Sequence, residues 1–89
     1  MPTISMFYGV LVTLFYEAAS PHKKPHIHAR YQKHKAALSI SDGSVLAGSL
    51  PPKKLKMTQV WMDLHREELM ANWTLAKAGA DPFKINPLQ

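Results

Sequence analysis

An Asp-Gly pair at positions 42 and 43 constrains the fold more than any other feature, because it separates two short runs of alternating apolar residues. A two-residue type I′ turn needs positive φ at both central positions, and Asp-Gly meets this requirement at low cost. With such a turn, Ile40 lies opposite Val45. Leu38 then lies opposite Ala47, so the apolar side chains of both strands share one face. The sequence therefore predicts an antiparallel hairpin in the middle of the chain.

A second hairpin is predicted just before the first, with strands over 26–32 and 35–41 joined by a turn at Lys33-His34. This register places Ala29 opposite Leu38 and keeps the apolar side chains on the same face. The other face collects polar side chains, and on it His28 is predicted to lie opposite Ser39. The predicted members of this outer face are His26, His28, Arg30, Gln32, Lys35 and Ser39.

The flanking segments complete the predicted fold. The segment from Phe7 to Glu17 is rich in β-branched and aromatic residues with apolar side chains on both faces, which predicts a central strand. After a loop over 18–25 and the two hairpins, Pro51-Pro52 favours a helix start. Two apolar stripes follow, and the second is rotated away from the first, so we expect a bend near His65. The stripes are Met57, Val60, Trp61 and Leu64, then Leu69, Met70, Trp73 and Ala76.

These elements define a single α+β domain. With 89 residues, the chain can form one modest core and no second domain. We predict a four-stranded, mostly antiparallel sheet over about residues 5–48. A C-terminal helical segment over about 51–79, bent or divided into two helices, packs on one face of the sheet, and an irregular tail follows over 80–89.

Charge and cysteine content narrow the classes of function. Eleven Lys and Arg against six Asp and Glu give a formal charge of +5, with five histidines in addition. This excess favours anionic partners such as RNA or DNA, although a solvated lysine-rich surface has the same composition. The absence of cysteine excludes disulfides, thiolate catalysis and Cys-ligated metal centres. The apolar run from Met6 to Phe15 is too short to cross a bilayer, so we expect a cytoplasmic protein without a membrane partner.

Several short motifs occur together along the chain. They are Met1-Pro-Thr-Ile-Ser, Phe7-Tyr8-Gly9, the run from Pro25 to Tyr31, Gly48-Ser49-Leu50-Pro51, Trp61, the run from Leu64 to Leu69, and Asn72-Trp73. In this combination the chain resembles the bacterial domain of unknown function 4160 family over nearly its whole length. The Lys23-Lys24 pair departs from the relatives' pattern, which often runs more directly into the histidine motif. The resemblance implies no defined activity. It does imply a toxin–antitoxin-like pair, with a small protein partner encoded nearby.

The outer-face histidines suggest a metal-independent ribonuclease as one interpretation. His26 or His28 would act as the general base or acid, and Arg30 would brace the phosphate, with Lys33 or Lys35 adding charge. Cleavage through the 2′-hydroxyl needs only proton transfer and stabilisation of the developing phosphate charge. The alternative is that both histidines are partly exposed polar residues of a sheet surface.

Metal binding through His26 and His28 is a second interpretation, because alternate strand positions lie about 6.6 Å apart and can converge on one ion. The sequence supplies no third ligand nearby. His22, His34, Asp42 or His65 would have to fold in, and no spacing rule predicts that any of them does. His65 has its own structural interpretation as a bend residue bonded to Glu68. The sequence therefore predicts no cofactor and no metal.

Non-catalytic binding is the third interpretation and the one adopted for this sequence. The polar sheet face, with Lys35 and Ser39, would contact nucleic acid or an acidic protein. Lys53 and Lys54 at the predicted helix start add a second basic site, since a helix N-terminus favours anions. We therefore predict a toxin–antitoxin-like component that acts by protein or nucleic-acid binding, with the ribonuclease as the alternative and metal binding behind it. A homodimer is also left open.

Overall fold

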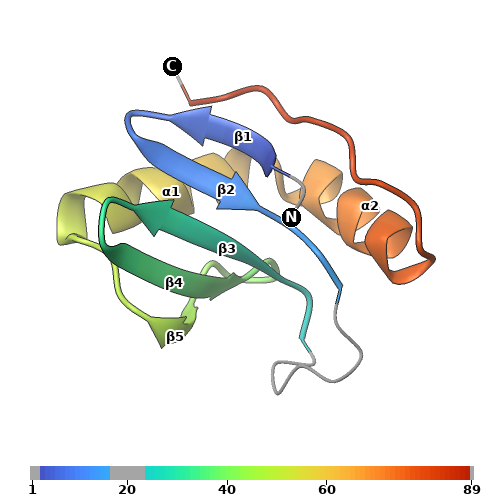
Figure 1. The fold of residues 1–89 in the computed structure, drawn as a ribbon, viewed down its shortest axis with the longest axis horizontal. Helices are drawn as coiled ribbons and strands as arrows, with labels where there is room; N and C mark the ends of the chain where they lie inside the picture. The colour runs from blue at the N-terminus through green and yellow to red at the C-terminus, as the bar shows by residue number, and fades with distance from the viewer. Residues whose placement is uncertain (1–2, 17–23, 89) are drawn as a thin grey trace.

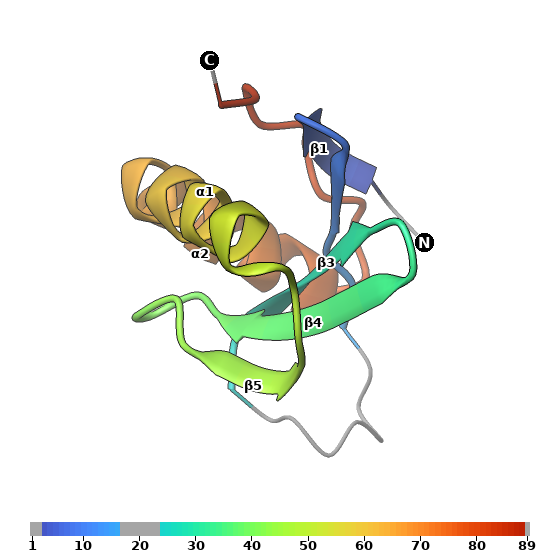
Figure 2. The same ribbon diagram turned by 90° about the vertical axis from the view of Figure 1, so that its left-hand side faces the viewer.

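Five strands followed by two helices make up the fold. The computed structural model describes residues 3–16 and 24–88, and Figure 1 shows the sheet in front of both helices. The elements are β1 (Thr3–Phe7), β2 (Val10–Thr13), β3 (His26–Tyr31), β4 (His34–Ser39), β5 (Val45–Gly48), α1 (Pro52–Leu64) and α2 (Arg66–Lys77). The strands pair in sequence order and antiparallel throughout. The predicted α+β class, with helices on one face of the sheet, is confirmed (Figure 2).

The sheet has five strands where four were predicted, because the expected strand over 7–17 is interrupted. A turn at Tyr8-Gly9 reverses the chain, so that Phe7 pairs with Val10. Gly9 has a φ of 81° and Tyr8 a φ of 48°, the positive values that a tight hairpin turn needs. Gly9 was the sequence signal for this turn. Glu17, the predicted end of the strand, lies outside the described residues, as do positions 18–23 of the predicted loop.

The hairpin of β3 and β4 forms, but its turn lies one residue earlier than predicted. The turn residues are Gln32 and Lys33, and Tyr31 pairs with His34. Gln32 adopts a φ of 53°. Glycine or asparagine at this position would have predicted a positive φ from the sequence, whereas glutamine does not. Every pair is therefore shifted by two positions, and Ala29 lies opposite Ala36 instead of Leu38. Because side chains alternate with period two, this shift leaves each strand's faces unchanged.

The Asp-Gly segment turns the chain as predicted, but through a longer loop. Gly43, with a φ of 75°, donates its N–H to the Ser39 carbonyl at 2.8 Å. Asp42 Oδ1 accepts the Ser44 N–H at 2.9 Å, a bond that lowers the pKa of the Asp42 carboxyl. Leu38 consequently pairs with Val45, and an irregularity then shifts the register. The prediction that Val45 and its neighbour Ala47 face the core is wrong, since both are exposed.

The helical segment divides at His65, which confirms the predicted bend. His65 ends α1 and precedes α2, and its Nδ1 donates to Glu68 Oε1 at 2.7 Å. In α1 the buried side chains are Thr58, Trp61 and Met62, whereas Leu64, from the predicted stripe, is 67% exposed. The core-facing stripe of α1 is thus rotated from the predicted one. Neither described helix is long and apolar enough to cross a membrane.

The irregular tail after α2 docks on the body of the protein. Asn72, fully buried, donates through Nδ2 to the Phe83 carbonyl at 2.8 Å and accepts the Phe83 N–H at 2.9 Å. Ile85 donates its N–H to the Ile4 carbonyl at 2.8 Å, so the tail runs along β1 (Figure 1). Trp61 Nε1 reaches the Asn86 carbonyl at 2.8 Å. The tail therefore covers the β1 edge of the sheet, while β5 forms the other edge.

Candidate functional site

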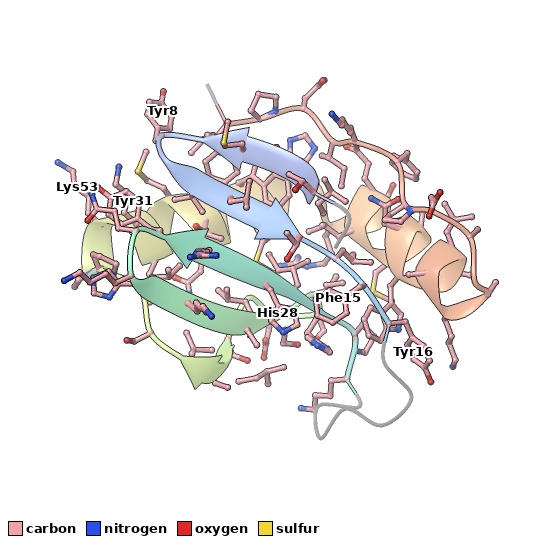
Figure 3. The ribbon with its side chains drawn as sticks, in the orientation of Figure 1. Tyr8, Phe15, Tyr16, His28, Tyr31 and Lys53 are labelled. Atoms are coloured by element: carbon pink, nitrogen blue, oxygen red, sulfur yellow. The ribbon has the colours of Figure 1, made fainter. Side chains whose placement is uncertain are left out.

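The outer face, which is the side of the sheet turned away from α1 and α2, is the candidate site. Strand pairing arranges its side chains in two rows across the sheet. One row contains Leu11, Arg30 and Lys35, and the other contains Thr13, His28, Ala37 and Ala47. Neither α1 nor α2 covers this face, and the view in Figure 3 looks directly onto it. His28, Arg30 and Lys35 therefore lie together on the face, as predicted from alternation.

A hollow of about 480 Å³ lies over β1, β2 and β3 on this face. Its volume falls within the range of small-molecule sites in proteins. Phe15 forms one wall and stacks on the His28 ring, with centroids 4.8 Å apart and planes at 11° (Figure 3). The principal lining residues are Thr3, Leu11, Thr13, Phe15, His28 and Arg30. Apolar and cationic groups thus share one hollow.

Arg30 and Lys35 face each other directly across β3 and β4. Both are exposed, and like charges placed opposite on neighbouring strands destabilise a sheet. The strands contain no Asp or Glu that could neutralise this pair. The acidic residues that the structure describes lie in the β4–β5 turn, the helices and the tail, at Asp42, Asp63, Glu67, Glu68 and Asp81. The charge of the outer face is therefore entirely positive over its described residues.

His26 differs from the expectation that it shares the exposed face. Alternation does place it with His28 and Arg30, but it is only 3% exposed. Its Nδ1 donates to the Lys24 carbonyl at 2.7 Å, and its ring lies 5.2 Å from that of Trp73. Trp73 comes from α2, so side chains from the helix layer close over this end of β3. The sequence could not show this closure, because it depends on packing between distant segments.

Three other predicted binding residues have different surroundings. Ser39 lies opposite His26 instead of His28, is 2% exposed and hydrogen-bonds Ser41. Lys54 Nζ donates to the Tyr8 carbonyl at 3.0 Å and lies 4.9 Å from the centre of the Tyr31 ring. Lys53 is exposed at the same end of the molecule, near the hairpin turns (Figure 3). Lys54 therefore links α1 to the first hairpin. Among the described contacts, Lys53 makes no corresponding bond to the hairpin.

The predicted metal ligands are scattered. Among the described residues, no group of three His, Asp or Glu side chains lies close enough to hold a metal ion. His34 begins β4, Asp42 bonds its own turn, and His65 bonds Glu68. His22 lies outside the described residues. A metal site built on His26 and His28 therefore gains no third ligand from His34, Asp42 or His65, the candidates that the structure describes.

The sequence interpretation missed Leu11 and Phe15 as site residues. It placed both on one of the two apolar faces of a single central strand, whereas they line the hollow on the outer face. An apolar side chain on an exposed sheet face has no signature of its own in the sequence. Only the interruption at Gly9, which shortens the strand, pointed to a different arrangement.

The fold and site together define a small α+β protein with helices on one sheet face and a cationic hollow on the other. The chain belongs to the family described as Domain of unknown function (DUF4160), whose model matches residues 9–74. The matched segment begins in the β1–β2 turn and ends in α2, so it contains the β2, β3 and β4 residues of the site. No curated protein and no solved structure matches the chain.

Proposed function

We propose that this protein binds nucleic acid through the outer face of its sheet. The observation that carries the proposal is the direct pairing of Arg30 with Lys35 on a face whose strands contain no Asp or Glu. A phosphate between two facing cations relieves their repulsion, because each cation gains a charge-assisted hydrogen bond to the anion. The excess of positive charge over the whole chain acts in the same direction, by steering an anionic polymer toward the surface.

The apolar part of the hollow supports a polynucleotide over a simple anion. Leu11 and Phe15 lie beside Arg30 in the same hollow. Proteins that bind single strands combine cationic grooves with aromatic side chains that contact base faces. Antiparallel sheets whose open face carries such aromatics are an established way to hold RNA bases. The outer face combines both elements.

The ribonuclease interpretation receives less support. Acid–base cleavage needs two proton-transfer groups that reach the same phosphate. Of the two candidate imidazoles, His28 lines the hollow, while His26 is buried against Trp73 and bonded to the Lys24 carbonyl. Guanidinium and ammonium groups such as those of Arg30 and Lys35 serve phosphate binding better than proton transfer. We therefore propose binding without cleavage.

Removing the facing cations tests the proposal. The double variant Arg30→Gln/Lys35→Gln is expected to weaken binding of a fluorescein-labelled single-stranded RNA about tenfold or more at low salt, because two phosphate contacts are lost. The salt dependence of the affinity should also become less steep, by about one unit of slope per lost contact. Fluorescence anisotropy between about 50 and 200 mM salt measures both quantities.

Lys56→Gln/Lys77→Gln is the matched control, since it removes the same charge from exposed positions on the helices. Its RNA affinity should stay close to that of the unaltered chain. If the two double variants lost RNA affinity equally, the loss would be explained by overall charge alone. This outcome would contradict a binding site on the outer face. The RNA recovered after the titration, with chelator present, should be intact.

A protein partner, as in a toxin–antitoxin-like pair, is the second candidate, favoured by exposed apolar side chains on α1. Val60 and Leu64 lie one helical turn apart and are 42% and 67% exposed. Tagged protein co-expressed with its gene neighbour should retain the neighbour on affinity resin, and Val60→Gln/Leu64→Gln should release it. Retention that survives this change would place the contact elsewhere. The unaltered chain eluting alone would remove this candidate.

A further inference from the structure

A second, smaller hollow lies beside the first on the outer face. It measures about 180 Å³ and lies over β4 and β5, where its floor consists of Ala37, Ala47 and Gly48. Because these residues have at most a methyl group as side chain, the floor is open and shallow. His28 and Lys35 line both hollows. The two hollows are therefore neighbours that share a border carrying an imidazole and an ammonium group.

The spacing of the hollows restricts what can occupy both at once. Most residues that line the larger hollow lie on β1, β2 and β3, and those of the smaller one lie on β3, β4 and β5. The middle strands of the two hollows, β2 and β4, are two strand spacings apart, about 10 Å. Successive bases in a double helix lie only about 3.4 Å apart along each strand. Two consecutive bases that are held about 10 Å apart, each with its face on the sheet, must be unstacked from each other, and an unpaired strand permits this.

From this geometry we propose that the outer face holds two consecutive unpaired nucleotides, one base in each hollow, with their connecting phosphate at His28 and Lys35. The inference rests on the proposed nucleic-acid binding and specifies its ligand as a single strand. In the larger hollow the base lies against Leu11 and Phe15. In the smaller hollow the base lies flat on Ala37 and Ala47, where a larger side chain would exclude it. Arg30, which lies directly opposite Lys35, contacts the same connecting phosphate from the side of the larger hollow.

The first test uses the unaltered chain and needs no variant. A short labelled RNA and a DNA of the same sequence are titrated as single strands and as duplexes under identical low-salt conditions. At least one single strand is expected to bind tenfold or more tightly than its duplex, since a duplex cannot place separated bases in the two hollows. Duplexes bound as tightly as single strands would overturn the inference and leave the proposed nucleic-acid binding intact. Failure of all four probes to bind would overturn both.

The second test fills the smaller hollow without changing charge. Ala47→Leu is expected to weaken single-strand binding about fivefold or more, because the larger side chain excludes the base from the smaller hollow and its apolar contact is lost. The control is Ala71→Leu, the same substitution at an exposed position of α2, which should leave binding unchanged. Circular dichroism melting verifies that both variants are folded. Equal affinities in the two folded variants would overturn the two-nucleotide arrangement, while sensitivity to Arg30→Gln/Lys35→Gln would still support the binding face. If Ala47→Leu does not fold, Ala47→Val takes its place.

Discussion

Replacing Gly48 by alanine is expected to lower the free energy of unfolding by about 2–4 kcal/mol, through left-handed strain and steric overlap together. Gly48 has a φ of 75°, a conformation that residues with a Cβ adopt at a cost. A Cβ built at this position would lie 2.1 Å from the Lys35 carbonyl oxygen. That oxygen accepts the Ser49 N–H at 2.9 Å, so it cannot retreat without breaking the pairing of β4 and β5. Urea unfolding followed by circular dichroism measures the change.

Gly79→Ala separates the two contributions. Gly79 has a similar φ of 86° at the end of α2, but a Cβ there would meet no atom within 4 Å. Its substitution should therefore cost only the left-handed strain, about 1–2 kcal/mol. If Gly48→Ala cost no more than this, the close approach of β5 to the Lys35 carbonyl would be contradicted. The expected difference between the variants is the contribution of that single backbone contact.

The sequence predicted side-chain faces more reliably than strand register. Ala29, Leu38 and Ile40 are in the core as expected, although the hairpin of β3 and β4 is shifted by two positions. Alternation determines which face is buried, and a two-residue shift preserves it. The exact position of the turn depends on residues such as Gln32, whose positive φ is not predicted by the conformational propensity of glutamine. Between Ala37 and Leu38 an irregularity shifts the pairing of β4 with β5 by one residue, and Val45, which was predicted to face the core, is exposed.

The candidate site was predictable only where it depends on alternation along one strand. His28, Arg30 and Lys35 share the outer face, as their spacing indicates. His26 has the same spacing, yet Trp73 from α2 covers it, a contact between segments far apart in the sequence. Phe15 follows the end of β2, on the same alternation as Leu11 and Thr13, and its ring stacks on that of His28. Local patterns thus identified the cations, and long-range packing decided which imidazole lines the hollow.

The cationic and the aromatic parts of the proposed binding site have different structural origins. The cations of the site are on β3 and β4, the hairpin whose faces are fixed by alternation, so their exposure is tied to the same pattern that builds the core. The aromatic wall is Phe15, which lies beyond the end of β2 and stacks on His28 with 4.8 Å between ring centroids. Phosphate attraction is therefore a property of the sheet itself, whereas the aromatic part of the base contact belongs to the segment that follows β2.

Trp61→Ala is expected to lower the free energy of unfolding by about 3–5 kcal/mol, because it empties the largest fully buried position of the core. The Trp61 ring lies 5.3 Å from that of Phe7 and 5.6 Å from that of His65, so it joins β1 to the helix junction. A small domain has only about 5–15 kcal/mol in total, and each lost kcal/mol lowers the Tm by about 4–8 °C at this size. The variant should therefore melt far below the unaltered chain.

Trp61→Phe and Trp73→Phe together test how the tail is held. Both replace a buried indole by a smaller ring, but only Trp61 donates its Nε1–H to the Asn86 carbonyl, while Trp73 packs on His26 and Tyr16. Trp61→Phe should therefore destabilise the protein by about 0.5–1.5 kcal/mol more than Trp73→Phe, the contribution of one hydrogen bond. It should also speed proteolytic cleavage in the tail. If both variants lose equal stability and resist the protease equally, the Trp61 bond does not hold the tail, and the two bonds of Asn72 to Phe83 are sufficient to dock it.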